Sequence, residues 1–223
     1  QTCALPIWFK NAFEKAGFTV EGFKNKFSSI GNTIGSIAGK IGDSIMKTFK
    51  DVEMKEYSNM KIGGTARELI IIEDKNELRE VIETRKNIFL LGNGTNTLIP
   101  DGKIDISFIS LKELKNITVE EVTENYDLVR VEAGLDLDEL IKYMERNNYS
   151  GLENIAGIPG SVGGLVNMNG GAYGTEIFDC IEEVEVCKEN GEVATYRKSD
   201  LTFKYRTTEI KENKWIVISA LFK

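Results

Sequence analysis

The chain has 223 residues, enough for one or two domains with a sizeable core. Its net charge of −7 argues against a sequence-independent grip on nucleic acid. The sequence contains no His, which excludes Ser–His and Cys–His nucleophile systems, imidazole metal ligands and a histidyl cofactor tether. Three Cys without a CxxC pair predict a reducing, cytoplasmic location and no metal site. Every apolar run is shorter than the roughly 18 residues of a membrane span.

Residues 1–45 differ from the rest of the chain in net charge and in the pattern of apolar residues. They carry five Lys and three acidic residues, a charge of +2, so residues 46–223 carry −9. A Gly-interrupted amphipathic helix is expected here, because apolar residues recur at spacings of three and four: Phe23, Phe27, Ile30, Ile34, Ile37 and Ile41. In composition the stretch resembles segments of phage tail tape-measure proteins.

The first seven residues, Gln1 to Ile7, match a translation of a common sequencing-library adapter. We therefore expect residues 1–45 to be foreign and the native protein to begin near Met46. A genuine N-terminal extension is the alternative.

From Met46 onward, strands are expected to alternate with short helices. Asp74 with Glu77, and Asp136 with Glu139, form capping-box patterns that predict helix starts. Asn190-Gly191 between two alternating runs predicts a β-hairpin. Strands are expected at Leu69–Ile72 and Ile88–Leu91, both buried, and at Ile106–Ile109, Ile117–Val122, Leu128–Val131, Val184–Val186, Val193–Thr195 and Trp215–Phe222. This order predicts an α+β fold with a mixed sheet.

Gly, Asn and Thr are concentrated between Gly92 and Thr97, directly after an expected strand. Gly and Asn tolerate positive φ, and successive N–H groups in such a turn can converge on an anion. The spacing is not the dinucleotide fingerprint of a Rossmann fold, because Thr97 replaces the third Gly and a turn follows at Pro100. A plain connection between strands is the alternative.

A second Gly-rich region has seven Gly within residues 157–174, among apolar neighbours. A flexible linker would be polar, so we expect this segment to be packed, with its backbone close to another group. A flat ligand with a diphosphate would fit, with Ile158 and Val162 against a ring and N–H groups toward phosphate. Farther along, apolar residues alternate with polar ones at Leu201, Phe203 and Tyr205, and Arg206 follows. The planar guanidinium of Arg206 suits a carboxylate or phosphate, or a surface ion pair.

Together these segments resemble the FAD-binding part of the UDP-N-acetylenolpyruvoylglucosamine reductase family (UDP-N-acetylmuramate dehydrogenases, MurB). The resemblance runs from Tyr57 to the chain end, about 165 of 223 residues. It rests on Gly157–Gly164, Asn169–Gly174 and Tyr205-Arg206. The chain departs from the family pattern at three positions, where Thr, Ser and Ala are usual: Met60, Thr95 and Gly170.

The resemblance implies two α+β subdomains with FAD between them, as in the vanillyl-alcohol oxidase (PCMH-type) superfamily. We expect the FAD to be non-covalent, since no His is present; a tether through Cys180 or Cys187 is the alternative. The pyrophosphate would be cradled by Gly92, Asn93, Gly94, Thr95 and Asn96. The flavin and adenosine part would lie beside Ile158, Pro159, Gly160, Ser161, Gly163, Gly164 and Asn169. Tyr205 and Arg206 would face the substrate, with Arg206 catalytic.

The implied reaction is the NADPH-dependent reduction of UDP-N-acetylglucosamine enolpyruvate to UDP-N-acetylmuramate in peptidoglycan synthesis. No segment matches the family's Ser proton donor or its C-terminal Glu. We therefore expect residues 46–223 to be the FAD-binding domain only, inactive alone, with the substrate-binding domain absent. A flavin-binding module without catalysis is one alternative. A structural phage-tail protein is another, resting on residues 8–45 alone.

Overall fold

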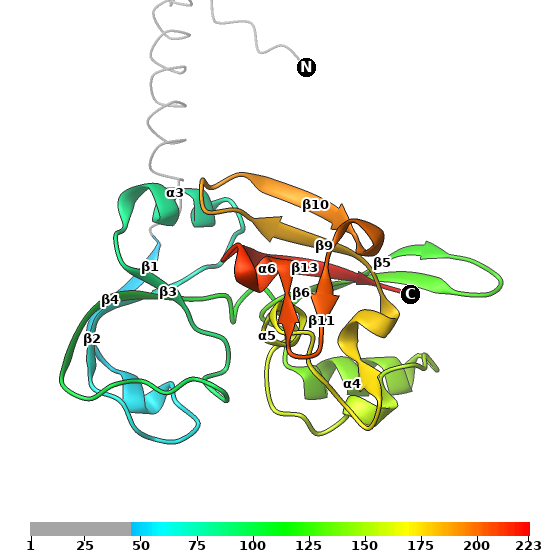
Figure 1. Cartoon of the computed structure of the whole chain (residues 1–223), viewed down its shortest axis with the longest axis horizontal. Helices are drawn as coiled ribbons and strands as arrows, with labels where there is room; N and C mark the ends of the chain where they lie inside the picture. The colour runs from blue at the N-terminus through cyan, green and yellow to red at the C-terminus, as the bar shows by residue number, and fades with distance from the viewer. Residues whose placement is uncertain (1–45) are drawn as a thin grey trace, which may run out of the picture. The chain divides into compact units, whose positions relative to one another are not determined.

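The computed structural model describes residues 46–223, which form one compact unit (Figure 1). The amphipathic helix expected before Met46 lies outside the described residues. Strands grouped into two main sheets dominate, with short helices between them, so the α+β expectation is confirmed. Within the described part, no helix is long and apolar enough to span a membrane.

The first sheet is mixed and has the strand order β1-β2-β4-β3. Its strands are β1 (Lys47–Glu53), β2 (Thr65–Ile71), β3 (Ile88–Leu90) and β4 (Lys103–Ser110). β2, β4 and β3 run parallel, and β1 is antiparallel to β2. The apolar run Leu69–Ile71 is buried, as expected for a central strand covered on both faces.

The expectation that Ile88–Leu91 forms a buried strand is wrong for most of its length. β3 is an edge strand paired only with β4, and its three residues Ile88, Phe89 and Leu90 are 37–40% exposed. Only Leu91, just beyond the strand, is buried. An apolar run in the sequence does not reveal whether a strand lies at a sheet edge.

Helix α3 (Glu77–Thr84) begins later than Asp74 predicts. The Asp74 carboxylate instead accepts from the backbone N–H of Asn76 at 2.8 Å. The Glu77 carboxylate accepts from the backbone N–H groups of Glu73 and Asp74 at 2.9 and 3.4 Å. The two acidic residues therefore build a turn that precedes the helix.

The second sheet is antiparallel throughout, with the order β10-β9-β13-β6-β5. Its strands are β5 (Ile117–Val122), β6 (Asp127–Glu132), β9 (Ile181–Cys187), β10 (Val193–Arg197) and β13 (Ile216–Phe222). The expected hairpin joins β9 to β10, with Gly191 at φ +80°. α4 (Leu137–Arg146) and α5 (Val162–Asn167) cover one side of this sheet, where Leu140 and Val166 share a buried core with Val131 (Figure 1).

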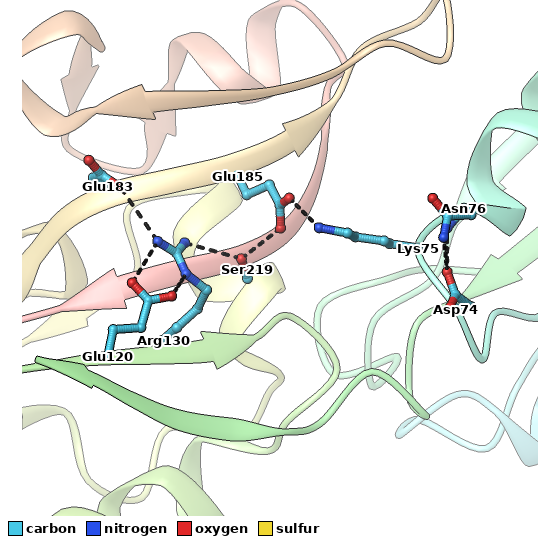
Figure 2. Close-up of polar contacts among 8 residues, drawn as sticks. All are labelled: Asp74, Lys75, Asn76, Glu120, Arg130, Glu183, Glu185 and Ser219. Carbon is cyan, nitrogen blue, oxygen red and sulfur yellow. Dashed lines mark hydrogen bonds and ion pairs between the residues drawn. The ribbon is translucent and has the colours of Figure 1, made fainter.

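The opposite face of the second sheet carries a row of polar contacts. The row runs from β5 to the turn before α3 (Figure 2). Arg130 on β6 binds the Glu120 carboxylate on β5 and donates to the Ser219 hydroxyl on β13 at 3.4 Å. Ser219 donates to Glu185 on β9 at 3.0 Å. Glu185 pairs at 2.6 Å with Lys75, in the turn before α3. This ion pair joins the turn before α3 to the second sheet.

Smaller elements complete the described chain. Two short hairpins are β7 (Gly171–Ala172) with β8 (Thr175–Glu176), and β11 (Phe203–Lys204) with β12 (Thr207–Thr208). The remaining helix is α6 (Glu209–Glu212), and the 3₁₀ turns are η1 (Met54–Glu56), η2 (Glu153–Ile155), η3 (Ile177–Cys180) and η4 (Lys198–Asp200).

Candidate functional site

The Gly92–Thr97 loop leaves the carboxyl end of β3, an end of a parallel strand where open sheets commonly bind ligands. Its first anchor is the Leu91 N–H, which donates to the Ile109 carbonyl at 2.8 Å. Within residues 46–223, the backbone N–H groups from Gly92 to Asn96 donate to no protein acceptor. Five consecutive free donors can converge on an anion.

Gly94 determines how closely this loop approaches the Tyr57–Asn59 turn. It has φ +64°, and an added Cβ would lie 2.1 Å from the Tyr57 carbonyl oxygen. Its own carbonyl accepts from the Asn59 N–H at 3.0 Å. The loop therefore rests directly on the Tyr57–Asn59 turn, and no side chain fits between them.

Three side chains of the loop also form hydrogen bonds to residues that flank α4 and α5. Asn93 Nδ2 donates to the Asp136 carboxylate, Thr95 Oγ1 to the Pro159 carbonyl at 3.1 Å, and Asn96 Nδ2 to the Met168 sulfur at 3.7 Å. The structure thus brings together the two Gly-rich regions that the sequence analysis assigned to one ligand.

The second Gly-rich region contains a helix that the sequence analysis missed. Ser161 is the N-cap of α5, and its hydroxyl accepts from the Gly164 N–H at 3.3 Å. The Val162 and Gly163 N–H groups donate to the carbonyls of Leu135 and Ala133, both at 2.8 Å. The donors from 162 to 164 are therefore used by the protein itself, contrary to the expectation that they face a phosphate. The Ser N-cap before an apolar run was the available signal.

At Gly163 the expected close approach is made to the protein itself. A Cβ there would lie 2.7 Å from the Ala133 Cβ. Val162 is fully buried in the core, so it does not face a ring as expected, whereas Ile158 is partly buried at the edge of that core. Gly160, at φ +153°, lies near the loop instead: its added Cβ would be 3.6 Å from Thr95 Oγ1.

Asn169 connects the two short hairpins. Its side chain is 1% exposed, and its Nδ2 donates to the Glu176 carboxylate at 2.6 Å and to the Lys204 carbonyl at 3.3 Å. Its Oδ1 has no hydrogen-bond partner in the described part of the chain. Ser58, beneath the Gly94 loop, has a second such buried atom, its hydroxyl oxygen. Buried polar atoms without a partner are rare and point to an absent ligand or water.

Tyr205 and Arg206 form the turn of the β11–β12 hairpin, and neither residue belongs to a strand. Arg206 has φ +59°, and its Nη2 donates to the Gly171 carbonyl of the neighbouring hairpin at 2.8 Å. Its guanidinium lies 5.4 Å from the centre of the Tyr205 ring, which is 79% exposed. Arg206 is exposed, and among residues 46–223 it makes no ion pair.

Ser58 and Asp136 belong to the site although neither was expected there from the sequence. Ser58 carries no motif and is recognised only by its burial. Asp136 was interpreted as a helix cap, and α4 does begin after it, but its carboxylate makes no cap hydrogen bond and binds Asn93.

Comparison with known proteins identifies the chain's relatives. The model of a family described as an FAD binding domain matches residues 68–197, more than half of the chain. UDP-N-acetylenolpyruvoylglucosamine reductase of Fusobacterium nucleatum is 49% identical over 180 residues, which are 80% of this chain and 63% of that protein. The enzyme of the same name from Thermosipho melanesiensis is 37% identical over 80% of this chain and 61% of that protein.

Comparison with solved structures also finds a reductase of this kind. UDP-N-acetylenolpyruvylglucosamine reductase from Thermus caldophilus superposes with a TM-score of 0.69 at 32% identity, over 80% of this chain and 62% of that one. An alkyldihydroxyacetonephosphate synthase shares the fold alone, with a TM-score of 0.55 at 13% identity, over 73% of this chain and 32% of that one. The chain therefore spans less than two thirds of the length of the reductases that it matches.

Proposed function

The chain belongs to the family of FAD-binding domains, and from this premise we propose that it binds FAD non-covalently as the cofactor-binding part of a cytoplasmic UDP-N-acetylenolpyruvoylglucosamine reductase. The proposed substrates are NADPH and the nucleotide sugar UDP-N-acetylglucosamine enolpyruvate. We assign the FAD-binding part to residues 46–223. The substrate-binding part corresponds to the share of the relatives' length that the match does not cover.

The observation that carries this proposal is the Gly92–Asn96 loop. Its five backbone N–H groups are free within the described chain, and Gly94 lets the loop lie flat on Tyr57. Such a nest of donors suits the two negative phosphates of FAD, because N–H dipoles directed at one point favour an anion. The residues present therefore fit the group. Gly160 and Ser161, which border the loop, would contact the same ligand.

The unpartnered Asn169 Oδ1 and Ser58 Oγ support the same assignment. An amide oxygen accepts a hydrogen bond, and a hydroxyl both donates and accepts. A ligand that carries ring N–H, ribose hydroxyl and phosphate groups can satisfy both. Glu176 and the Lys204 carbonyl hold the Asn169 amide in place, so its oxygen is oriented before any ligand binds.

FAD, when bound, supplies the hydride chemistry that links NADPH to the enolpyruvyl double bond. In our proposal Arg206 holds the substrate carboxylate and stabilises the negative charge that develops next to it. Its bond to the Gly171 carbonyl uses one donor and orients the rest of the planar fork. The exposed Tyr205 ring lies 5.4 Å from the guanidinium and would face the substrate with it.

Purification of the full chain in the presence of FAD tests the proposal. Flavin should stay bound through gel filtration at one equivalent and should enter the supernatant completely when the protein is denatured, because no histidyl tether exists. Gly94→Val, which places a side chain against the Tyr57 carbonyl, should lose the flavin. Absence of flavin in the folded wild-type protein would contradict FAD binding, and flavin left in the pellet would contradict a non-covalent site.

Substrate titration separates the reductase from a flavin-binding module without catalysis. In a fusion of this chain to the remaining, substrate-binding part of a related reductase, the enolpyruvyl nucleotide sugar should perturb the absorbance of the bound flavin, and Arg206→Ala should abolish that change while it keeps the flavin. In turnover, loss of one such donor typically costs about 10²–10³ in rate. A flavin spectrum that the nucleotide sugar never perturbs would favour the module.

A further inference from the structure

Asp136 occupies the N-cap position of α4 but does not cap it. Its backbone is extended, with φ −66° and ψ 140°, as N-cap residues require, yet its side chain accepts no hydrogen bond from the helix. The carboxylate instead accepts from Asn93 Nδ2, 43 positions earlier in the chain. The Asp136 carboxylate, which could cap α4, is thus directed at the Gly92–Thr97 loop instead.

The backbone on both sides of Asp136 is fixed to the second Gly-rich region. The Leu137 N–H donates to the Gly160 carbonyl at 2.9 Å, and Asp136 and Ser161 form an isolated antiparallel bridge. The Asp136 carbonyl accepts from the Leu140 N–H at 3.0 Å, inside the helix. The carboxylate therefore projects from a rigid support toward a loop that is rich in Gly.

The loop needs such a support, because free N–H groups bind an anion well only if they are oriented beforehand. Gly94 fixes the loop on one side through the Asn59 N–H and Tyr57. Asn93 is the residue through which the other side is held to Asp136. We propose that Asp136 is a positioning residue that orients the Gly92–Asn96 donors for a diphosphate by holding the Asn93 side chain; this rests on the proposed function.

A positioning role and a purely electrostatic role predict opposite effects. A carboxylate close to a diphosphate repels it, so removal of the charge alone would tighten FAD binding. If orientation dominates, Asp136→Ala should weaken FAD binding by about tenfold, the factor equivalent to 1.4 kcal/mol and to one hydrogen bond to a charged group. Asp136→Asn keeps an acceptor for Asn93 and should restore binding to within a few-fold of wild type.

The experiment compares FAD dissociation constants for the full chain and its variants, measured by quenching of flavin fluorescence. Asp138→Ala is the matched control: it removes an equal charge from the first turn of the same helix, where Asp138 pairs with Lys142 at 2.6 Å. It should leave the dissociation constant unchanged. Asn93→Ala should weaken binding as Asp136→Ala does, and the double variant should be no weaker than either single one.

Three results would overturn the inference: equal effects of Asp136→Ala and Asp138→Ala, tighter binding in Asp136→Ala, or additive losses in the double variant. The side-chain amide resonances of Asn93 in the flavin-free protein give a readout that does not depend on FAD. They should shift in Asp136→Ala and move back in Asp136→Asn. A wild type that takes up no FAD would refute the proposed function, whereas unshifted Asn93 resonances would refute the role of Asp136.

Discussion

Substitution of Gly163 by Ala tests whether this Gly serves packing or ligand contact. The new methyl would lie 2.7 Å from the Ala133 Cβ and 3.1 Å from the Ala133 carbonyl oxygen, so α5 must move away from the second sheet. Overpacking of this kind costs about 1–3 kcal/mol. Replacing Gly by Ala within a helix returns roughly 0.5–1 kcal/mol. We expect a net loss of up to about 2.5 kcal/mol in the free energy of unfolding.

Gly164→Ala is the control, one residue farther along the same helix. Its Cβ would lie 3.4 Å from Ser161 Oγ, an ordinary contact, and its φ is not in the left-handed region. It should gain up to about 1 kcal/mol from helix propensity. Urea unfolding of the flavin-free chain, followed by circular dichroism, measures both variants. Equal or greater stability of Gly163→Ala compared with Gly164→Ala would refute the packing argument.

Two further predictions concern groups away from the site. The Tyr149 hydroxyl donates to the Asp127 carboxylate at 2.6 Å, and this hydrogen bond raises the pKa of Tyr149 to about 12. The bond therefore contributes its full stability below about pH 10, and this contribution is lost as the pH rises through about 12. Asp127→Asn should move the titration of one tyrosine, followed by tyrosinate absorbance, down toward pH 10. An unchanged titration curve would contradict this. Lys75→Met and Glu185→Gln should each lower the free energy of unfolding by up to about 1 kcal/mol, with a coupling that shrinks in high salt. Additive, salt-independent losses would show that the ion pair does not stabilise the fold.

Short-range sequence patterns predicted much of this fold. The Asn190-Gly191 hairpin and the start of α4 after Asp136 follow from local backbone preferences. The apolar run before Phe222 forms the fully buried β13, because a central strand is covered on both faces. These elements depend on their own residues, so the sequence alone contains the information.

What the sequence could not reveal depends on distant partners. The exposure of β3 results from its edge position, which only the pairing of strands decides. Gly163 is small because Ala133 lies opposite, and the Asp136 carboxylate leaves its own helix because Asn93 is in reach. The Gly-rich composition predicted correctly that the backbones of these regions are packed closely, but it could not say whether the neighbour is a ligand or the protein itself.

In our proposal, the free N–H groups of the Gly92–Asn96 loop bind the diphosphate of FAD. Titration of the flavin-free full chain with FAD and with FMN, which lacks the diphosphate bridge and the adenosine, tests it most directly. Two or more donors at about 1–1.5 kcal/mol each predict that FAD binds at least about thirtyfold more tightly than FMN. Equal dissociation constants for FAD and FMN would contradict the account.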